Sequence, residues 1–175
     1  MVQKQIFRIA LIVLFLFPVV THVQAQAFKE KDLVLNAGLG LGSTYAAGLW
    51  GGGFGLPIGV GAEYGVASLE KGVIGVAGEF GYVGYNFYSL TTFGVRGSFH
   101  FAELLELEKD NLDLYGGLGL YYRNFNFEGT AFATGGAFLS FHAGARYYLS
   151  EKFGVYGEIG NTWAWLNLGV VFKIN

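Results

Sequence analysis

The sequence repeats one seven-residue pattern three times, as GVGAEYG at Gly59–Gly65, GVAGEFG at Gly75–Gly81 and GVYGEIG at Gly154–Gly160. In each copy bulky apolar residues alternate with small residues or a single glutamate, and a period of two is the period of a β-strand. In the first copy one face carries valine, alanine and tyrosine, whereas the other carries three glycines and Glu63. A narrow barrel in lipid needs this arrangement, because bulk then faces hydrocarbon while small and polar groups face a tight interior.

The composition excludes several other classes of protein. The 175 residues are 53% apolar and only 14% charged, whereas soluble domains average about 25% charged residues. After residue 25 no run approaches the roughly 20 apolar residues of a transmembrane helix. The 29 glycines show no G-X-Y repeat, and there is no cysteine, which excludes collagen and a disulfide framework. A formal net charge of −2 without a basic patch argues against nucleic acid as a partner.

Residues 1–25 have the features of a cleaved secretory signal peptide: a short basic start, an apolar stretch and an exit of small residues. The alternative is an N-terminal membrane anchor, for which the apolar stretch is short. We predict cleavage after Ala25, or after Ala27, which leaves residues 26–175 as one outer-membrane β-barrel domain. The basic start consists of Lys4 and Arg8, and the apolar stretch covers residues 9–20.

Eight segments alternate with period two, and we predict an all-β fold, an eight-stranded antiparallel up-and-down transmembrane β-barrel. Most segments are near the 9–11 residues, roughly, that a tilted strand needs to cross hydrocarbon. Short charged turns alternate with longer loops, notably Gly42–Leu56 and Asn124–Gly136, as they do at the two ends of outer-membrane barrels. The predicted strands are residues 32–42, 57–67, 72–85, 90–102, 111–123, 137–149, 152–162 and 165–174.

Aromatic residues cluster near the predicted strand ends, and aromatic girdles mark the two water boundaries of a membrane barrel. The outer girdle is predicted to contain Tyr82, Tyr85, Phe87, Tyr88, Tyr122, Phe125, Trp163 and Trp165, and the inner one Phe101, Tyr147, Phe153 and Phe172. Surface contacts with a partner are predicted to use Trp50, Phe54, Phe125, Phe127 and Phe132. The alternative role for these loop aromatics is anchoring in lipid headgroups.

Charged residues fall on the predicted inner face. Two carboxylates in a low-dielectric interior, such as Glu63 and Glu79, repel each other unless a cation lies nearby, and Arg96 can supply it. Arg146 and Glu158 are predicted to form a second pair. Because an eight-strand interior is only wide enough for side chains, we interpret these groups as a structural plug, with a gate or proton-linked element as the alternative. The predicted lumen charge network is Glu63, Glu79, Arg96, Arg146 and Glu158, with Asp113, Arg123 and Lys173 on the same face.

Two Ser-Phe-His segments, Ser98–His100 and Ser140–His142, place hydroxyl and imidazole groups on one strand face, the inner one. A barrel enzyme that hydrolyses or transfers acyl chains needs a Ser/His/acid set where the ester lies, at the lipid surface. These side chains are predicted to point into the lumen, and a whole strand separates the two histidines. We therefore predict no enzyme activity, no catalytic, cofactor-binding or metal-ligating residues, and no cofactor.

The last third of the chain carries a resemblance. GARYYLS at residues 144–150, KFGVYGEIG at 152–160 and LNLGVVF at 166–172 resemble the closing strands of the OmpA/OmpX-type outer-membrane β-barrel family. The resemblance implies an eight-stranded barrel in outer-membrane lipid, inserted by the outer-membrane assembly machinery of a Gram-negative cell. Barrels of this type perform many different tasks, so the fold does not choose a function.

We interpret the chain as a small, closed, monomeric outer-membrane barrel with a structural, surface-interaction or envelope-maintenance role, and the sequence names no specific protein or ligand partner. One alternative is a narrow porin-like channel, which steady single-channel conductance would reveal. A second is an envelope lipid-modifying barrel enzyme, which needs a Ser/His/acid cluster on the lipid face or rim. A third is a soluble secreted ligand-binding barrel, whose solvent face would consist largely of glycine and alanine with few charges.

Overall fold

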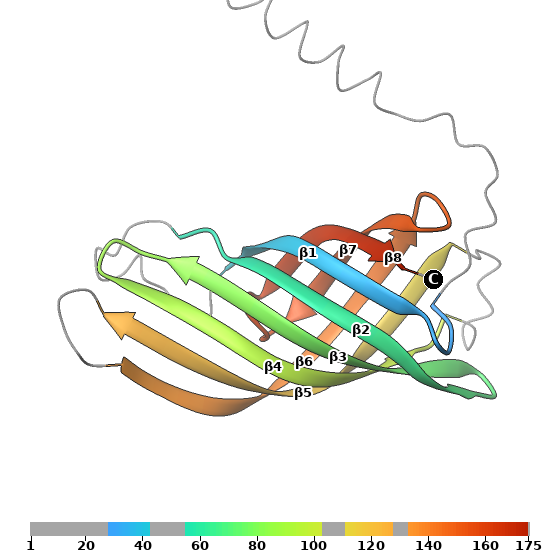
Figure 1. The fold of residues 1–175 in the computed structure, drawn as a ribbon, viewed down its shortest axis with the longest axis horizontal. Coiled ribbons are helices and arrows are strands. Elements are labelled where there is room, and N and C mark those ends of the chain that lie inside the picture. Colours follow the sequence, from blue (N-terminus) through green and yellow to red (C-terminus); the bar gives the residue numbers. More distant parts are fainter. Residues whose placement is uncertain (1–27, 43–54, 103–110, 128–132, 175) are drawn as a thin grey trace, which may run out of the picture.

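Eight antiparallel strands follow one another around a barrel that closes by pairing of the first strand with the last (Figure 1). The computed structural model describes residues 28–42, 55–102, 111–127 and 133–174. The predicted all-β, eight-stranded antiparallel up-and-down barrel is confirmed. The strands are β1 Leu33–Leu41, β2 Ile58–Leu69, β3 Gly72–Gly84, β4 Tyr88–His100, β5 Leu112–Phe127, β6 Ala133–Tyr148, β7 Phe153–Gly160 and β8 Leu166–Lys173.

Most large apolar side chains of the strands point outward, and the charged side chains of the strands point inward. Val60 and Leu118 are 55% and 70% exposed, whereas Glu63 is only 2% exposed. A soluble protein buries its large aliphatic residues and exposes its carboxylates. The reverse distribution is the one expected of a barrel whose outer surface lies in hydrocarbon. The period of two therefore predicted the two faces of each strand correctly.

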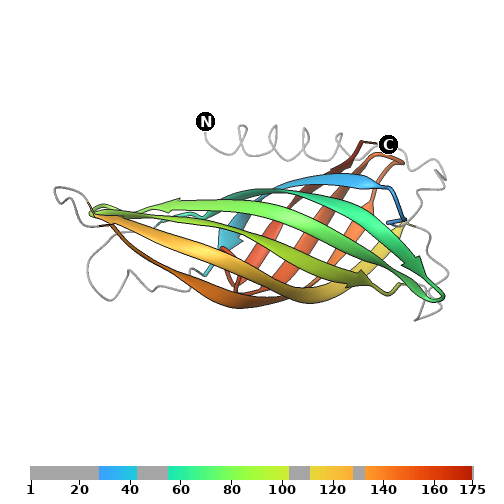
Figure 2. The same ribbon diagram turned by 60° about the horizontal axis from the view of Figure 1, so that its bottom comes forward.

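The β5–β6 hairpin is longer than the sequence predicted. The prediction of a loop over Asn124–Gly136 is wrong, because the strand ladder continues until Asn126 pairs with Ala133. The N-F-N-F stretch before residue 128 keeps the alternation of a strand, although asparagine also favours turns. Strands β3 to β6 therefore project beyond the ends of β1, β7 and β8, as Figures 1 and 2 show.

Several sequence predictions concern residues outside the described part of the chain. They are the signal peptide of residues 1–25, its cleavage after Ala25 or Ala27, and the surface role of Trp50, Phe54 and Phe132. Within the described residues, no helix has the length and apolar character needed to cross a membrane.

The segment before β1 turns back into the barrel at the end where β1 begins and β8 ends. The backbone N–H of Lys29 donates to the Asp32 carboxylate at 2.9 Å, and Lys31 adopts a left-handed backbone with φ of 72°. The N–H of Lys31 donates to the Gly65 carbonyl at 2.8 Å. This turn places Phe28 in the lumen, where it is 4% exposed.

An ion pair fastens the same turn to the last strand. Lys173 on β8 lies 2.7 Å from the carboxylate of Asp32, and β8 pairs directly with β1. The ring of Phe28 stacks on His100 with a centroid distance of 4.0 Å. The turn before β1 is therefore held both by β8, through Lys173, and by the lumen, through His100.

Candidate functional site: the barrel lumen

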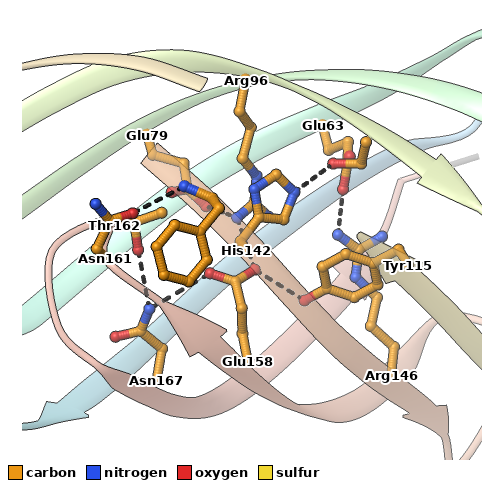
Figure 3. A network of polar contacts seen from close by, with 12 residues as sticks. Glu63, Glu79, Arg96, Tyr115, His142, Arg146, Glu158, Asn161, Thr162 and Asn167 are labelled. Carbon is orange, nitrogen blue, oxygen red and sulfur yellow. Dashed lines mark hydrogen bonds and ion pairs between the residues drawn. The ribbon is translucent and has the colours of Figure 1, made fainter. Parts of the chain in front are cut away.

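Arg96 on β4 stands at the centre of the first group of lumen ion pairs (Figure 3). Its Nη1 lies 3.1 Å from Glu79 on β3 and 2.6 Å from Glu158 on β7. All three side chains are buried. Because β4 and β7 are not neighbours in the sheet, this guanidinium ties walls of the barrel that share no backbone hydrogen bonds.

Arg146 on β6 forms the second group. Its Nη2 contacts Glu63 on β2, and its Nη1 lies 3.4 Å from Asp113 on β5. The guanidinium also lies over the ring of Tyr115, 4.6 Å from the ring centroid. Arg146 is 1% exposed, so its charge depends on these partners for stabilisation.

The predicted pair between Arg146 and Glu158 is wrong. The register places Arg146 opposite Tyr156 and Glu158 opposite Gly144, so the two charges are diagonal neighbours and not direct cross-strand partners. Each reaches across the lumen instead, Arg146 to β2 and Glu158 to Arg96. The sequence identified charges on the inner face, but pairing across a lumen depends on how the whole barrel closes.

Further donors of the lumen bind the carboxylates. His100 has Nδ1 2.8 Å from Asp113 and Nε2 3.3 Å from Glu63. The Tyr121 hydroxyl donates to Glu79 at 2.7 Å. The hydroxyl of Tyr115 and the amide of Asn167 donate to Glu158 at 3.1 and 3.4 Å. Such a connected buried network specifies one arrangement of the strands, because a carboxylate left without its donors would be costly.

Ser98 and His142 meet inside the lumen, 3.0 Å apart between Oγ and Nε2. This contact is not evident from the sequence, because β5 separates the two strands. The other ring nitrogen of His142 has no hydrogen-bond partner among the described residues, whereas a hydrolytic triad requires an acid there. Both side chains are buried, away from the lipid face. Among the described residues, no group of three or more histidines and carboxylates is arranged to hold a metal ion.

The β7–β8 connection closes the end of the lumen opposite Phe28, which we call the loop end. Trp163 is 6% exposed and Thr162 is fully buried. The guanidinium of Arg123 donates to the Thr162 carbonyl at 3.0 Å, and the Asn167 amide donates to the Thr162 hydroxyl at 3.1 Å. The predicted place of Trp163 in the outer girdle is therefore wrong, whereas Trp165 is 49% exposed. These donors hold the connection inward, and its bends break the alternation on which the prediction depended.

Glycines make the socket that receives the Trp163 side chain. A Cβ built on Gly59 or on Gly81 would overlap Trp163, and one on Gly40 would meet its ring at 3.0 Å. Gly59 and Gly81 are also direct partners across β2 and β3. The absence of side chains at these glycines therefore leaves the space that the Trp163 indole fills.

Gly81→Ala tests this socket. We expect it to lower the free energy of unfolding by about 1–3 kcal/mol, the usual cost of overpacking, measured by urea unfolding in detergent micelles. Gly78→Ala is the matched control on the same strand, because nothing lies within 4 Å of its Cβ position. It should be neutral or slightly stabilising, since alanine restricts the unfolded chain. Equal losses for both variants would contradict the socket.

Phe125 and Phe127, predicted as loop contacts, belong to the extended part of β5. Phe125 pairs with Leu90, which is 2% exposed, so the two share the inner face. The ring of Phe127 lies 5.9 Å from that of Tyr88 and 6.5 Å from that of Phe125. An aromatic lining therefore continues the lumen wall beyond Trp163, on the strands that project.

No protein-family model and no curated protein matches this chain, whereas solved structures do. The N-terminal β-barrel domain of Pseudomonas aeruginosa OprF matches with a TM-score of 0.57 and 16% identity, over 83% of this chain and 100% of that one. A de novo designed transmembrane β-barrel gives 0.56 and 17%, over 85% and 100%. The Yersinia pestis outer membrane protein Ail in a phospholipid bilayer nanodisc gives 0.51 and 14%, over 83% and 100%. At these identities the likeness establishes the fold of eight-stranded outer-membrane barrels.

Proposed function

We propose that this chain is a closed, monomeric outer-membrane barrel of a Gram-negative envelope, with a structural, surface-interaction or envelope-maintenance role. The observation that carries the proposal is a lumen filled by paired charges and covered at both ends by buried aromatic residues. Phe28 lies at the end where β1 begins and β8 ends, and Trp163 lies at the opposite end, in the β7–β8 connection. Such an interior stabilises the barrel and leaves its outer surface and loop end to make contacts.

The outer face supports a location in lipid. Leu118, Leu139 and Ile159 are 70%, 78% and 62% exposed, and a band of such side chains is stable only against acyl chains. The predicted signal peptide supports export, after which insertion by the outer-membrane assembly machinery would place the loop end outside. In this proposal the apolar outer surface of the barrel contacts outer-membrane lipid.

The lumen argues against the porin-like alternative. A solute would have to displace Trp163, separate Arg96 and Arg146 from their carboxylates and then displace Phe28. Breaking a buried ion pair by removing one partner costs about 3–5 kcal/mol. The enzyme alternative lacks support as well, because the Ser98–His142 pair lies in the lumen and not on the lipid face.

Reconstitution and fractionation test the proposal together. We expect the protein to sediment with the outer membrane when cells are fractionated. We expect the purified barrel to change gel mobility on heating and to give no steady single-channel conductance in planar bilayers. A large-pore porin in the same lipid is the positive control for conductance. Recovery in the inner membrane would contradict the location. Steady conductance that changes in Arg96→Ala would contradict the closed lumen.

A further inference from the structure

The outer wall of the barrel has an apolar groove where three neighbouring strands carry small residues. Ala37 on β1, Ala62 on β2 and Gly78 on β3 are exposed on the lipid face, and all three line the groove. No atom outside the adjacent residues lies within 4 Å of a Cβ position at Gly78. The groove has a volume of about 1010 Å³, which is at the upper end of the range for ligand pockets, roughly 300–1,000 Å³.

Two pairs of phenylalanine rings border this groove. Phe80 and Phe93 are direct partners on β3 and β4. Phe153 and Phe172 are direct partners on β7 and β8. All four rings are exposed on the outer wall and line the groove. Because the outward side chains that line the groove are all apolar and lie in hydrocarbon, its occupant must itself be a molecule of the membrane.

The floor of the groove rises from the end of the barrel where β1 begins. Phe172 pairs with Leu35. Ala62 pairs with Leu35 on one side and with Gly78 on the other. Phe172 is next to the last residue of β8, whereas Gly78 lies midway along β3. Three strand spacings of about 4.8 Å cover roughly 14 Å, which is no more than half of the hydrocarbon thickness of about 30 Å. The groove therefore belongs to the leaflet at this end of the barrel.

A lysine lies at the same end of the groove. Lys152 directly precedes Phe153, and its exposed side chain forms no ion pair among the described residues, whereas Lys173 is paired with Asp32. Cations at this depth attract the phosphates of lipid headgroups. Glu151 is exposed beside Lys152 in the β6–β7 turn, so the turn presents both signs of charge. The headgroup of phosphatidylethanolamine, with one phosphate and one ammonium group, complements that pair.

A second copy of the chain fills this groove poorly. In a two-fold contact the same residues of both copies meet, so Gly78 would face the floor of the other groove and the bordering phenylalanine rings would touch first. Two facing grooves enclose empty space, and the side chains around that space lose dispersion contacts. An acyl chain is narrow and flexible, so it can lie between the rings and contact the floor.

We propose that this groove binds one glycerophospholipid of the inner leaflet of the outer membrane, with an acyl chain on the floor at Ala62 and Gly78 and the phosphate on Lys152. The acyl chain gains dispersion contacts with the floor and with the phenylalanine rings, and the lysine fixes the headgroup at the water boundary. The inference rests on the proposed function, which places the loop end outside the cell and this end in the periplasm. It gives the envelope-maintenance role a defined ligand.

Native mass spectrometry of the purified protein, released from detergent with added phosphatidylethanolamine, tests the proposal. We expect the unaltered chain to retain one phospholipid. Gly78→Leu fills the floor of the groove and should lower the affinity at least about tenfold. Gly97→Leu is the matched control, because Gly97 is also an exposed glycine of the lipid face, with only the Gly75 carbonyl oxygen near its Cβ position, at 4.0 Å, and it lies outside the groove. It should retain the phospholipid as the unaltered chain does.

The lysine is tested with a pair of lipids that share their acyl chains. Lys152→Ala should weaken binding of phosphatidylethanolamine about fivefold, the contribution of one cation near a membrane surface. It should leave the affinity for diacylglycerol, which lacks the phosphate, unchanged. Heat-modifiable mobility of each variant shows that the barrel has folded. Ala62→Leu fills the same floor and repeats the test if Gly78→Leu does not fold.

Three outcomes would overturn the proposal. Equal retention by Gly78→Leu and Gly97→Leu would show that phospholipid contacts the wall without using the groove. Diacylglycerol bound as tightly as phosphatidylethanolamine would exclude the phosphate contact. A dimer that Gly78→Leu abolishes would identify a second copy as the occupant. Because the measurement uses purified protein in detergent, its result is separate from the fractionation that tests the cellular location.

Discussion

Arg146→Ala is expected to lower the free energy of unfolding by about 3–5 kcal/mol, the usual effect of removing one partner from a buried ion pair. The substitution removes the guanidinium that Glu63 and Asp113 share and leaves His100 as the partner common to both carboxylates. It also removes the guanidinium from the Tyr115 ring and leaves a cavity that the narrow barrel wall cannot collapse to fill.

Urea unfolding in detergent micelles, read by heat-modifiable gel mobility, measures this effect. Lys152→Ala is the matched control, because it also removes one positive charge but from an exposed site in the β6–β7 turn. It should stay within about 0.5 kcal/mol of the unaltered chain. The double variant Arg146→Met/Glu63→Gln should recover part of the loss, since it removes both members of a pair. If the Arg146→Ala barrel is as stable as the Lys152→Ala control, the lumen ion pairs do not stabilise the fold.

Trp163→Ala is expected to cost about 3–5 kcal/mol, the range for truncating a buried aromatic residue. The indole fills the space between Gly59 and Gly81, and alanine would leave that space empty. Thr162 would keep its hydrogen bonds to Arg123 and Asn167, so the connection should stay in place while its packing is lost.

Trp165→Ala provides the comparison, because this tryptophan lies two residues further along and is 49% exposed. Trp165→Ala should lower the free energy of unfolding in detergent much less than Trp163→Ala does. The reason is that only about half of the Trp165 surface is buried against the protein. The midpoint of urea unfolding for the two variants in the same detergent gives the answer. If both variants unfold at the same urea concentration, Trp163 does not stabilise the barrel from inside.

Much of the fold was predictable from the sequence because β-strands in lipid encode their two faces locally. The alternation around Glu63 predicts both the strand and the direction of its carboxylate, without information from other segments. The end of a strand depends on weaker signals. Asn124 and Gly136 have the character of turn residues, yet cross-strand pairing extends the ladder past both of them.

The partners inside the lumen were less predictable, for a geometric reason. Neighbouring strands share a register that a hairpin fixes, whereas the contact of Arg96 with Glu158 depends on the tilt and offset of all strands between them. The same holds for Ser98 and His142, which meet across β5. The inward position of Trp163 depends on the hydrogen bond that Arg123 donates to the Thr162 carbonyl, which no side-chain pattern records.

The meeting of the Phe28 turn with Lys173 has a consequence for biogenesis. Asp32 can reach this lysine only when the final strand lies beside the first, so this ion pair cannot form before the β1–β8 seam closes. Before β8 has paired with β1, the chain lacks both the β1–β8 ladder and the ion pair between Lys173 and Asp32. Pairing of β8 with β1 is thus the step that closes the barrel and completes this ion pair.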